Sequence, residues 1–269
     1  LAIVADVMPL VSINRPLVQK GLEMLSQSRR PAFEAVCAYL GKSRFGAEDI
    51  GYGIAPRINS AGRMEDAAIA LRFLRAGTLG EASSGWLALD NLNQKRRQIE
   101  TETTEAAVAM ANPDDPVIVV AGEGWHEGVV GIVASRLVDR FKKPAIVLSV
   151  ENGQAKGSGR SIGDVDLFML LDRCKIHLNG FGGHKMAAGL RLDVEKLETF
   201  RTALRKEASK LDPELFFPKE HIMGELPIAE VDWELMEILS RFEPYGEANT
   251  KPKFLMKDIS IIEARPIGA

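Results

Sequence analysis

Three short stretches of the chain combine glycine with cationic and polar side chains, a composition that suits the binding of phosphate groups. Residues 181–189 read Phe-Gly-Gly-His-Lys-Met-Ala-Ala-Gly. Gly182 and Gly183 remove side-chain bulk where the backbone can approach a ligand closely, and His184 and Lys185 place polar donors beside them. The stretch predicts a glycine-rich turn that enters a strand and contacts an anion.

The second stretch, residues 124–136, reads Gly-Trp-His-Glu-Gly-Val-Val-Gly-Ile-Val-Ala-Ser-Arg. It predicts a loop that leaves a strand and enters a helix, where free backbone N–H groups attract anions. His126 suits a phosphate or metal contact as well as a structural role, and Trp125 suits base stacking as well as packing. Gly128 and Gly131 also suit close contact between a helix and a sheet.

The third stretch, residues 156–161, reads Lys-Gly-Ser-Gly-Arg-Ser and predicts an anion nest of backbone N–H groups. It lacks the residue order of a nucleotide-binding P-loop. The chain also lacks the Cys/His spacing of a zinc site, the nucleophile elbow of serine hydrolases and a dinucleotide fingerprint. Phosphate binding is therefore the function that these glycines favour.

Residues 56–63, Pro-Arg-Ile-Asn-Ser-Ala-Gly-Arg, are a further candidate for phosphate binding. Arg57 and Arg63 flank small or polar residues, Asn59 and Ser60 among them, with no carboxylate between them. Arginine forks bind phosphate oxygens in a bidentate manner and stay charged. A polar loop with arginines at helix ends is the alternative interpretation.

Groups that drive catalysis are scarce in this sequence. Asp6 ends an apolar run, and the carboxyl end of a strand in an α/β fold is where metal and catalytic groups collect. An aspartate in a turn is the alternative. Metal-dependent hydrolysis of a phosphodiester needs several carboxylates or histidines around one or two ions. The four histidines are scattered along the chain, at positions 126, 177, 184 and 221.

The composition is that of a globular protein, and 269 residues are enough for two domains. No apolar run approaches the ~20 residues of a membrane helix. Two cysteines do not form a disulfide framework, so we expect a reducing, cytoplasmic setting. The net charge is −3, yet residues 125–191 carry ten Lys/Arg against six Asp/Glu, and residues 193–247 carry seven against fourteen. This asymmetry favours a local polyanion-binding face.

The elements that position these residues begin with a mainly helical part. Apolar spacing predicts a strand at 1–7 and helices at 15–28, 31–40 and 65–74. A capping box at 78–81 precedes a pattern without glycine or proline from Trp86 to Asn112. The pattern predicts a connecting helix of about 30 residues, roughly 45 Å long.

After the long helix the pattern changes to that of a compact α/β domain at residues 113–212. Its expected strands lie at 116–121, 144–150, 154–160 and 187–192. Its expected helices lie at 129–141, 167–174 and 195–209. Residues 213–269 predict an extended piece at 221–226, a helix at 233–242 and a strand at 253–262. The predicted fold class is α/β.

These motifs, in this order, resemble the RecJ family of single-strand-specific 5′→3′ DNA exonucleases in the DHH phosphoesterase superfamily. Residues 4–10 are similar to the last metal-binding motif of the DHH domain, and residues 56–63 to the family's Arg-x-Asn-x-x-Gly-Arg segment. Pieces similar to the DHH-associated domain lie at 125–136, 157–161 and 181–189. Residues 243–254 are similar to the opening of the family's OB-type nucleic-acid-binding domain.

The resemblance implies a domain order. Residues 1–77 correspond to the C-terminal portion of the DHH catalytic domain and residues 78–112 to a connecting helix. Residues 113–212 correspond to the DHH-associated substrate-binding domain, and residues 213–269 to the start of the OB-type domain.

The resemblance further implies hydrolysis of phosphodiester bonds by two divalent ions, Mn²⁺ or Mg²⁺, in DNA repair and recombination. Asp6 is then a catalytic metal ligand. Single-stranded DNA with a 5′ end is the implied substrate of a monomer that acts without a membrane, with a helicase and a single-strand-binding protein as partners. The implied DNA contacts are Arg57, Asn59, Arg63, His126, Arg136, Ser158, Arg160, Ser161 and His184.

Three alternatives remain at this point. A phosphodiesterase for oligonucleotides or cyclic dinucleotides has little need of the OB-like tail. A non-catalytic module that binds single-stranded nucleic acid has little need of Asp6. An aminoacyl-tRNA editing module does not account for Asp6 and the arginine motif ahead of the associated domain.

The chain departs from the family in lacking the Asp-His-His sequence that names the superfamily. We therefore interpret it as a fragment without most of the DHH domain and much of the OB domain, which binds metal poorly.

We predict that this polypeptide alone has no measurable nuclease activity, because two-metal hydrolysis needs more carboxylates than Asp6 supplies. The assay is the release of nucleotides from 5′-phosphorylated single strands with Mn²⁺. Robust digestion would contradict the prediction.

Overall fold

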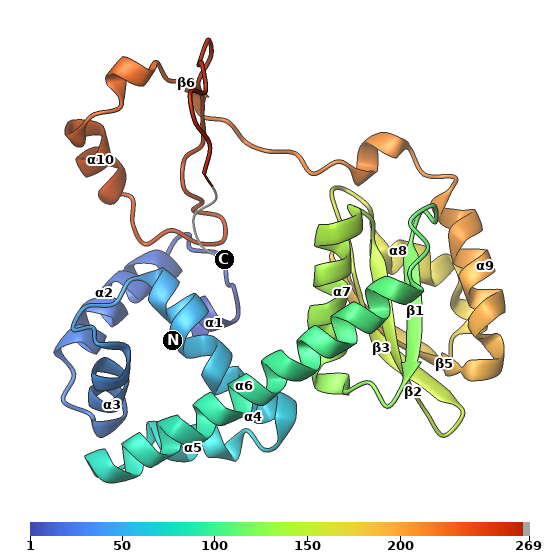
Figure 1. The fold of residues 1–269 in the computed structure, drawn as a ribbon, viewed down its shortest axis with the longest axis horizontal. Coiled ribbons are helices and arrows are strands. Elements are labelled where there is room, and N and C mark those ends of the chain that lie inside the picture. The colour runs from blue at the N-terminus through green and yellow to red at the C-terminus, as the bar shows by residue number, and fades with distance from the viewer. Residues whose placement is uncertain (266–269) are drawn as a thin grey trace. The chain divides into compact units, whose positions relative to one another are not determined.

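The computed structural model describes residues 1–265, so the last four residues of the expected OB-type segment lie outside the described part. The chain divides into two compact units. The first unit comprises residues 1–56, 77–83 and 220 onward, and the second comprises residues 57–76 and 84–219 (Figure 1). Each unit is described by itself.

A mixed five-stranded sheet forms the centre of the second unit, with strand order β1-β2-β3-β5-β4. Strands β1 and β2 are parallel, and every other neighbouring pair is antiparallel. The strands are β1 (Ile118–Glu123), β2 (Ala145–Glu151), β3 (Gln154–Arg160), β4 (Gly180–His184) and β5 (Ala187–Asp193). The predicted strands at 116–121, 144–150, 154–160 and 187–192 are confirmed within two residues at each end.

Helices cover both faces of this sheet (Figure 1). Ala145 and Val147 of β2 pack against α7 (Glu127–Phe141) on one face. Ile146 and Leu148 pack on the other face, against α8 (Leu167–Arg173) and α9 (Leu197–Ala208). Because successive side chains of a strand point to opposite faces, a strand buried on both sides reads as a continuous apolar run.

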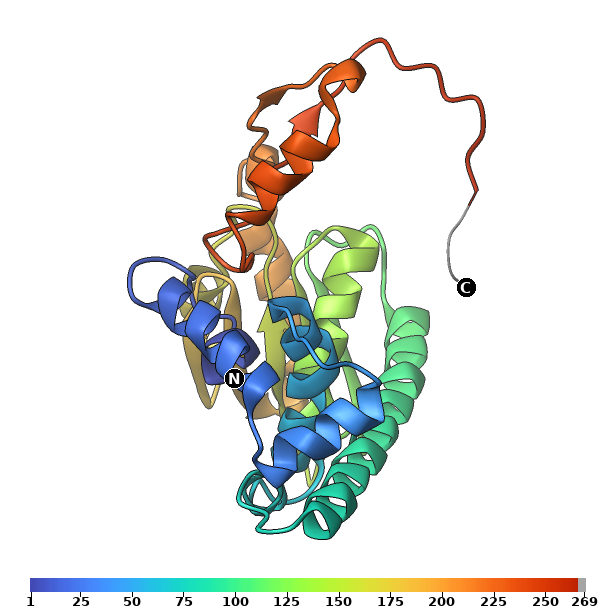
Figure 2. The ribbon, with the colours of Figure 1, turned by 90° about the vertical axis from the view of Figure 1, so that its left-hand side faces the viewer.

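The long helix α6 (Leu79–Met110) has 32 residues and is continuous in both views (Figures 1 and 2). One half of the predicted capping box is confirmed, since Thr78 Oγ1 accepts a hydrogen bond from the Glu81 N–H at 3.2 Å. The Glu81 carboxylate accepts from the Gly77 N–H at 2.9 Å instead of from Thr78. In the second unit, the rings of Trp86 in α6 and Phe73 in α5 (Ala68–Leu74) lie 5.5 Å apart. Ala107, near the other end of α6, is buried in the cluster around α7.

The first unit contains α1 (Ala2–Ala5), α2 (Asn14–Gln27), α3 (Pro31–Leu40), the π-helix η1 (Asp49–Ile54), α10 (Trp233–Ser240) and a parallel pair of two-residue strands, β6 (Gly224–Glu225) and β7 (Phe254–Leu255). Arg15 Nη2 donates to the Arg241 carbonyl at 3.2 Å, and Lys251 pairs with Glu48 at 2.6 Å. These contacts tie the start of the chain to the segment after residue 220.

The short 3₁₀ helices of the chain are η2 (Lys175–His177), η3 (Val194–Lys196), η4 (Pro213–Phe216) and η5 (Ile228–Glu230). Within residues 1–265 no helix combines the length and the apolar character needed to cross a membrane.

The predicted strand at residues 1–7 is wrong. The residues form α1, and Asp6 lies at the C-terminal end of that helix. A strand needs a neighbour to satisfy its backbone groups, and none of residues 1–56 is in a strand. A short apolar run alone does not distinguish strand from helix.

Four other stretches differ from what the sequence suggested. Residues 56–63 lie in α4 (Ala55–Met64) and not in the loop of the alternative interpretation, and residues 180–184 form β4 rather than a turn. Residues 154–160 form β3, so their backbone N–H groups serve the ladder with β2 and β5 instead of an anion nest. The expected strand at 253–262 shrinks to the two residues of β7.

A half-buried carboxylate holds the turn between β4 and β5. Asp164, in the loop after β3, pairs with Lys185 at 2.7 Å and with Lys219 at 2.8 Å. Hydrogen bonds from Lys185 and then Lys219 lower the pKa of the Asp164 carboxyl to about 2. The turn therefore depends on an ionised aspartate.

We predict that the free energy of unfolding of the Asp164→Asn variant falls less steeply than that of the wild type when the pH is lowered from about 4 to 2. The folded-state pKa lies below the unfolded value of about 3.9, so the ion pairs stabilise the fold fully above about pH 4 and are lost as the pH falls toward 2. Urea unfolding of the wild type and the variant across this range measures the difference. The exposed Asp139, in α7, provides the control Asp139→Asn. Identical profiles for the two variants would contradict the prediction.

Candidate anion-binding site

The second unit gathers arginines from three elements. Arg63 ends α4, Arg160 ends β3, and Arg96 lies in α6. Burial lowers the pKa of the Arg160 guanidinium, and the charge of Arg63 lowers it further. Burial also lowers the pKa of the Arg96 guanidinium. The carboxylate of Glu100 raises this pKa, and the charges of Arg63 and Arg97 lower it further. The guanidinium groups are therefore close enough to repel one another.

Arg160 is a half-buried cation without a neutralising carboxylate. Its Nη1 donates to Ser158 Oγ at 2.6 Å and to the Gly159 carbonyl at 2.8 Å. In the described part of the chain neither Arg160 nor Arg63 forms an ion pair. A desolvated charge normally finds a partner of opposite sign. An anion is the ligand that this arrangement fits.

Helix α7 passes directly over Arg160. A Cβ atom on Gly131 would lie 2.9 Å from Arg160 Nη2 and 3.3 Å from Ser158 Oγ. At the start of α7, the N-cap residue His126 accepts a hydrogen bond from the Gly128 N–H on its Nδ1, at 3.0 Å. The first turn of a helix carries partial positive charge, which favours an anion nearby.

Gly128 brings α4 against the start of α7. A Cβ atom at this position would lie 2.2 Å from the Arg63 carbonyl oxygen. The Arg63 side chain in turn donates from Nη1 to the Gly128 carbonyl at 3.2 Å. Both contacts fix Arg63 beside the first turn of α7, and only glycine allows the approach.

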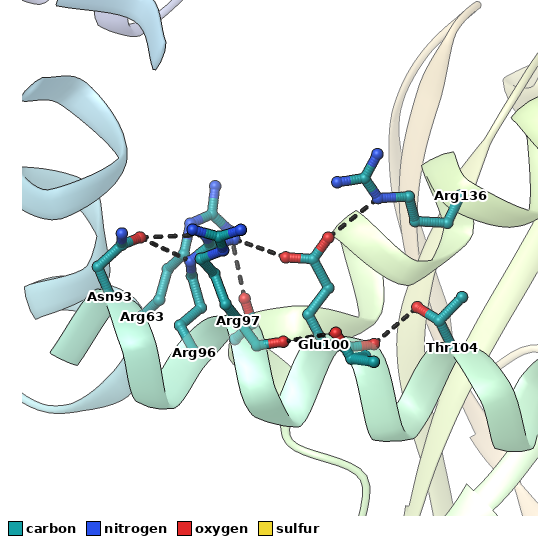
Figure 3. A network of polar contacts seen from close by, with 9 residues as sticks. Arg63, Asn93, Arg96, Arg97, Glu100, Thr104 and Arg136 are labelled. Atoms are coloured by element: carbon teal, nitrogen blue, oxygen red, sulfur yellow. Dashed lines mark hydrogen bonds and ion pairs between the residues drawn. The ribbon is translucent and has the colours of Figure 1, made fainter. Parts of the chain in front are cut away.

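Helix α6 contributes a polar network that the sequence analysis missed (Figure 3). Glu100 accepts from Arg96 Nη1 at 2.7 Å and from Arg136 Nε at 3.0 Å. Arg96 also donates to Asn93 Oδ1 from Nε and Nη2, at 3.2 and 3.0 Å. The spacing of four between Arg96 and Glu100 is the available signal in the sequence, since residues four apart in a helix are neighbours.

Arg57 is held inside the second unit. Its Nε donates to Asp90 Oδ1 at 2.6 Å, and its guanidinium lies 5.5 Å from the centre of the Trp86 ring. Ser60 donates to the Arg57 carbonyl at 2.6 Å, and Asn59 is half-buried. This geometry favours a role for Arg57 in fixing α4 against α6. A DNA contact by Arg57 or Asn59 stays a prediction.

The remaining polar candidates of the second unit differ in exposure. Ser161 is buried; its hydroxyl donates to the Val165 carbonyl at 2.7 Å and its N–H to the Met186 carbonyl at 2.9 Å, which favours a structural role. His184 is exposed, and its Nδ1 accepts from the Met186 N–H at 3.3 Å. Trp125 lies against Gly122, where a Cβ would come within 2.2 Å of the indole ring. Packing therefore accounts for Trp125.

Gly183 and Gly182, in the 181–189 stretch, differ in whether the surrounding structure leaves room for a side chain. Gly183 has a φ of +148°, and a Cβ there would lie 2.3 Å from the Ala187 carbonyl oxygen, so the β4–β5 pairing itself requires glycine. A Cβ on Gly182 would meet nothing within 4 Å. Only Gly182 leaves open space for a ligand.

Asp6 is exposed and belongs to the first unit. Among residues 1–265, no group of three or more His, Cys, Asp or Glu side chains has the arrangement of a metal site. The described residues thus do not supply the donor set that a pair of divalent ions needs.

We predict that Gly128→Ala destabilises the second unit by about 1–3 kcal/mol, because the new methyl group meets a backbone carbonyl that cannot move freely. Urea unfolding followed by circular dichroism measures the change. Gly21→Ala is the matched control, since a Cβ at that position of α2 meets nothing within 4 Å. The control should gain up to about 1 kcal/mol. Wild-type stability of Gly128→Ala would refute the contact.

Two family models match the chain. Residues 114–210 match the DHHA1 domain, and residues 222–269 match the RecJ OB domain. The single-stranded-DNA-specific exonuclease RecJ of Bacillus subtilis is 36% identical over an alignment of 274 positions, which covers 99% of this chain and 35% of that protein. RecJ of Escherichia coli is 32% identical over 94% of this chain and 47% of its own length.

The fold agrees with these matches. The crystal structure of RecJ from Thermus thermophilus in complex with Mg²⁺ superposes with a TM-score of 0.85 at 30% identity, over 94% of this chain and 40% of that one. The Mn²⁺ complex of the same protein gives a TM-score of 0.86 at 29% identity, over 94% of this chain and 38% of that one. The chain spans less than half the length of each of these relatives.

Proposed function

Because the chain is homologous to the single-stranded-DNA-specific exonucleases named RecJ, we propose that its second unit binds the phosphate backbone of single-stranded DNA for such an exonuclease. The observation that carries this proposal is the half-buried Arg160 beside Arg63, neither of which has a carboxylate partner in the described chain. Phosphate is the anion that DNA supplies at regular intervals.

The arrangement binds one phosphate from several directions. Arg63 and Arg160 bring permanent charge and planar donor forks. The hydroxyl of Ser158 and the first turn of α7, capped by His126, lie against Arg160 and Arg63 respectively. Contacts to the phosphate backbone carry no base preference, so this site holds a strand without reading its sequence.

The reaction of the complete enzyme is part of the proposal. In that enzyme two divalent ions, Mn²⁺ or Mg²⁺, would supply an activated water and stabilise charge on the scissile phosphate. The proposed setting of the reaction is DNA repair and recombination. Asp6 is the proposed contribution of this chain to that centre. The role of the second unit is to bind and orient the strand. We further propose the domain boundaries 1–77, 78–112, 113–212 and 213–269, with a helicase and a single-strand-binding protein as partners of a cytoplasmic monomer.

We predict that Arg160→Ala and Arg63→Ala each weaken binding to a fluorescein-labelled oligothymidylate about tenfold, and lower the slope of log K against log salt by about 1, because each removes one phosphate contact. Fluorescence anisotropy over a range of salt concentrations measures both quantities.

Arg140→Ala is the matched control, because Arg140 is an exposed arginine in the last turn of α7 and the substitution removes the same charge. We expect it to change affinity less than about twofold, since distant exposed charges are screened. If all three variants bind alike, the assignment of Arg63 and Arg160 is wrong.

A further inference from the structure

Glu100 is a buried carboxylate with an arginine on each oxygen. Its side chain is 9% exposed, Oε2 accepts from Arg96 Nη1 at 2.7 Å, and Oε1 accepts from Arg136 Nε at 3.0 Å. The carboxylate therefore connects α6 with α7 (Figure 3). Its two partners differ in how much of each guanidinium remains available.

Arg96 is fully engaged. Its side chain is 12% exposed, and Nε, Nη1 and Nη2 all donate to Asn93 or Glu100. It offsets the charge of Glu100 in a place where an unpaired carboxylate would be costly. Its hydrogen bond holds Oε2 of Glu100, while Arg136 binds Oε1.

Arg136 is anchored at one atom only. Its side chain is 59% exposed, and Nε is the atom that Glu100 holds. Figure 3 shows its two terminal nitrogens pointing away from Glu100. These two nitrogens form the edge of the guanidinium that binds two phosphate oxygens at once. Holding Nε reduces the side-chain freedom that a phosphate contact would otherwise remove.

We propose that Glu100 is a positioning residue, which orients Arg136 so that its terminal nitrogens contact a phosphate of single-stranded DNA. This proposal rests on the proposed function and extends it. On this proposal the carboxylate of Glu100 favours the binding of a polyanion, because it orients Arg136.

The direction in which one substitution changes the affinity for DNA distinguishes this role from simple electrostatic repulsion. Removing a negative charge near a DNA-binding surface ordinarily raises affinity, because the carboxylate repels phosphates. A positioning role gives the opposite sign, since the freed Arg136 loses its orientation. Glu102 provides the matched control on α6, because it is exposed and accepts a hydrogen bond from Gln98 at 2.9 Å instead of from an arginine.

The experiment compares Glu100→Gln with Glu102→Gln in the whole chain, by anisotropy with labelled oligothymidylate. We expect Glu102→Gln to bind as tightly as the wild type or slightly more tightly. Glu100→Gln should bind about three- to tenfold more weakly, the range for one charge-assisted contact. Affinity of Glu100→Gln equal to or above that of Glu102→Gln would overturn the proposal.

A double-mutant cycle with Arg136→Ala separates positioning from structural damage. In the Arg136→Ala background, Glu100→Gln should cause no further loss. An equal loss in both backgrounds would show that Glu100 acts through the fold and not through Arg136. If Glu100→Gln does not fold, Arg136→Lys carries the test, because it keeps the charge and lacks the planar fork. It should bind more weakly than the wild type, and wild-type affinity would overturn the proposal.

Failure of the proposed function has a different signature. In that case Arg160→Ala and Arg63→Ala leave the binding of oligothymidylate unchanged. If those two variants weaken binding and Glu100→Gln does not, only the role of Glu100 is wrong.

Discussion

The approach of the Arg63 carbonyl to Gly128 is the constraint on which the candidate anion-binding site depends. With no side chain at position 128, the end of α4 lies against the first turn of α7. That contact brings Arg63 to the helix under which Ser158 and Arg160 lie. The site is thus assembled by backbone packing, and the packing tolerates no larger residue at this point.

Gathering cations in this way has a cost in stability, because burial and mutual repulsion both disfavour the charged guanidinium. The sheet supplies the compensation. Helix α7 packs on one of its faces, and α8 and α9 pack on the other. A rigid, well-packed core can hold charged groups in an arrangement that an isolated loop could not maintain. An anion bound here would relieve the repulsion among the guanidinium groups, and this relief would add to the affinity for the anion.

Sequence patterns predicted the α/β domain and the first long helices well and residues 1–7 poorly, for physical reasons. The helices expected at 15–28 and 31–40 agree with α2 and α3 within one residue at each end. Strand β2 is a continuous apolar run, and helix α7 has apolar residues at helical spacing, with glycine or proline near the ends of both. Residues 1–7 have apolar character without a partner strand, and only the tertiary structure reveals that. The glycines of 156–161 suggested an anion nest, yet they serve close packing: a Cβ on Gly159 would meet Leu167 at 2.8 Å. The pairing of Glu100 with Arg136 joins residues 36 positions apart and has no local signal.

Strand β4 forms one edge of the five-stranded sheet. An edge strand presents unpaired backbone groups on which another chain can add a strand. Here the edge is only five residues long, carries Gly182 and Gly183, and leads into a charged turn at Lys185. Short length, low strand propensity and charge all disfavour such addition. The same glycines that first indicated ligand binding therefore also protect the protein against aggregation through its sheet.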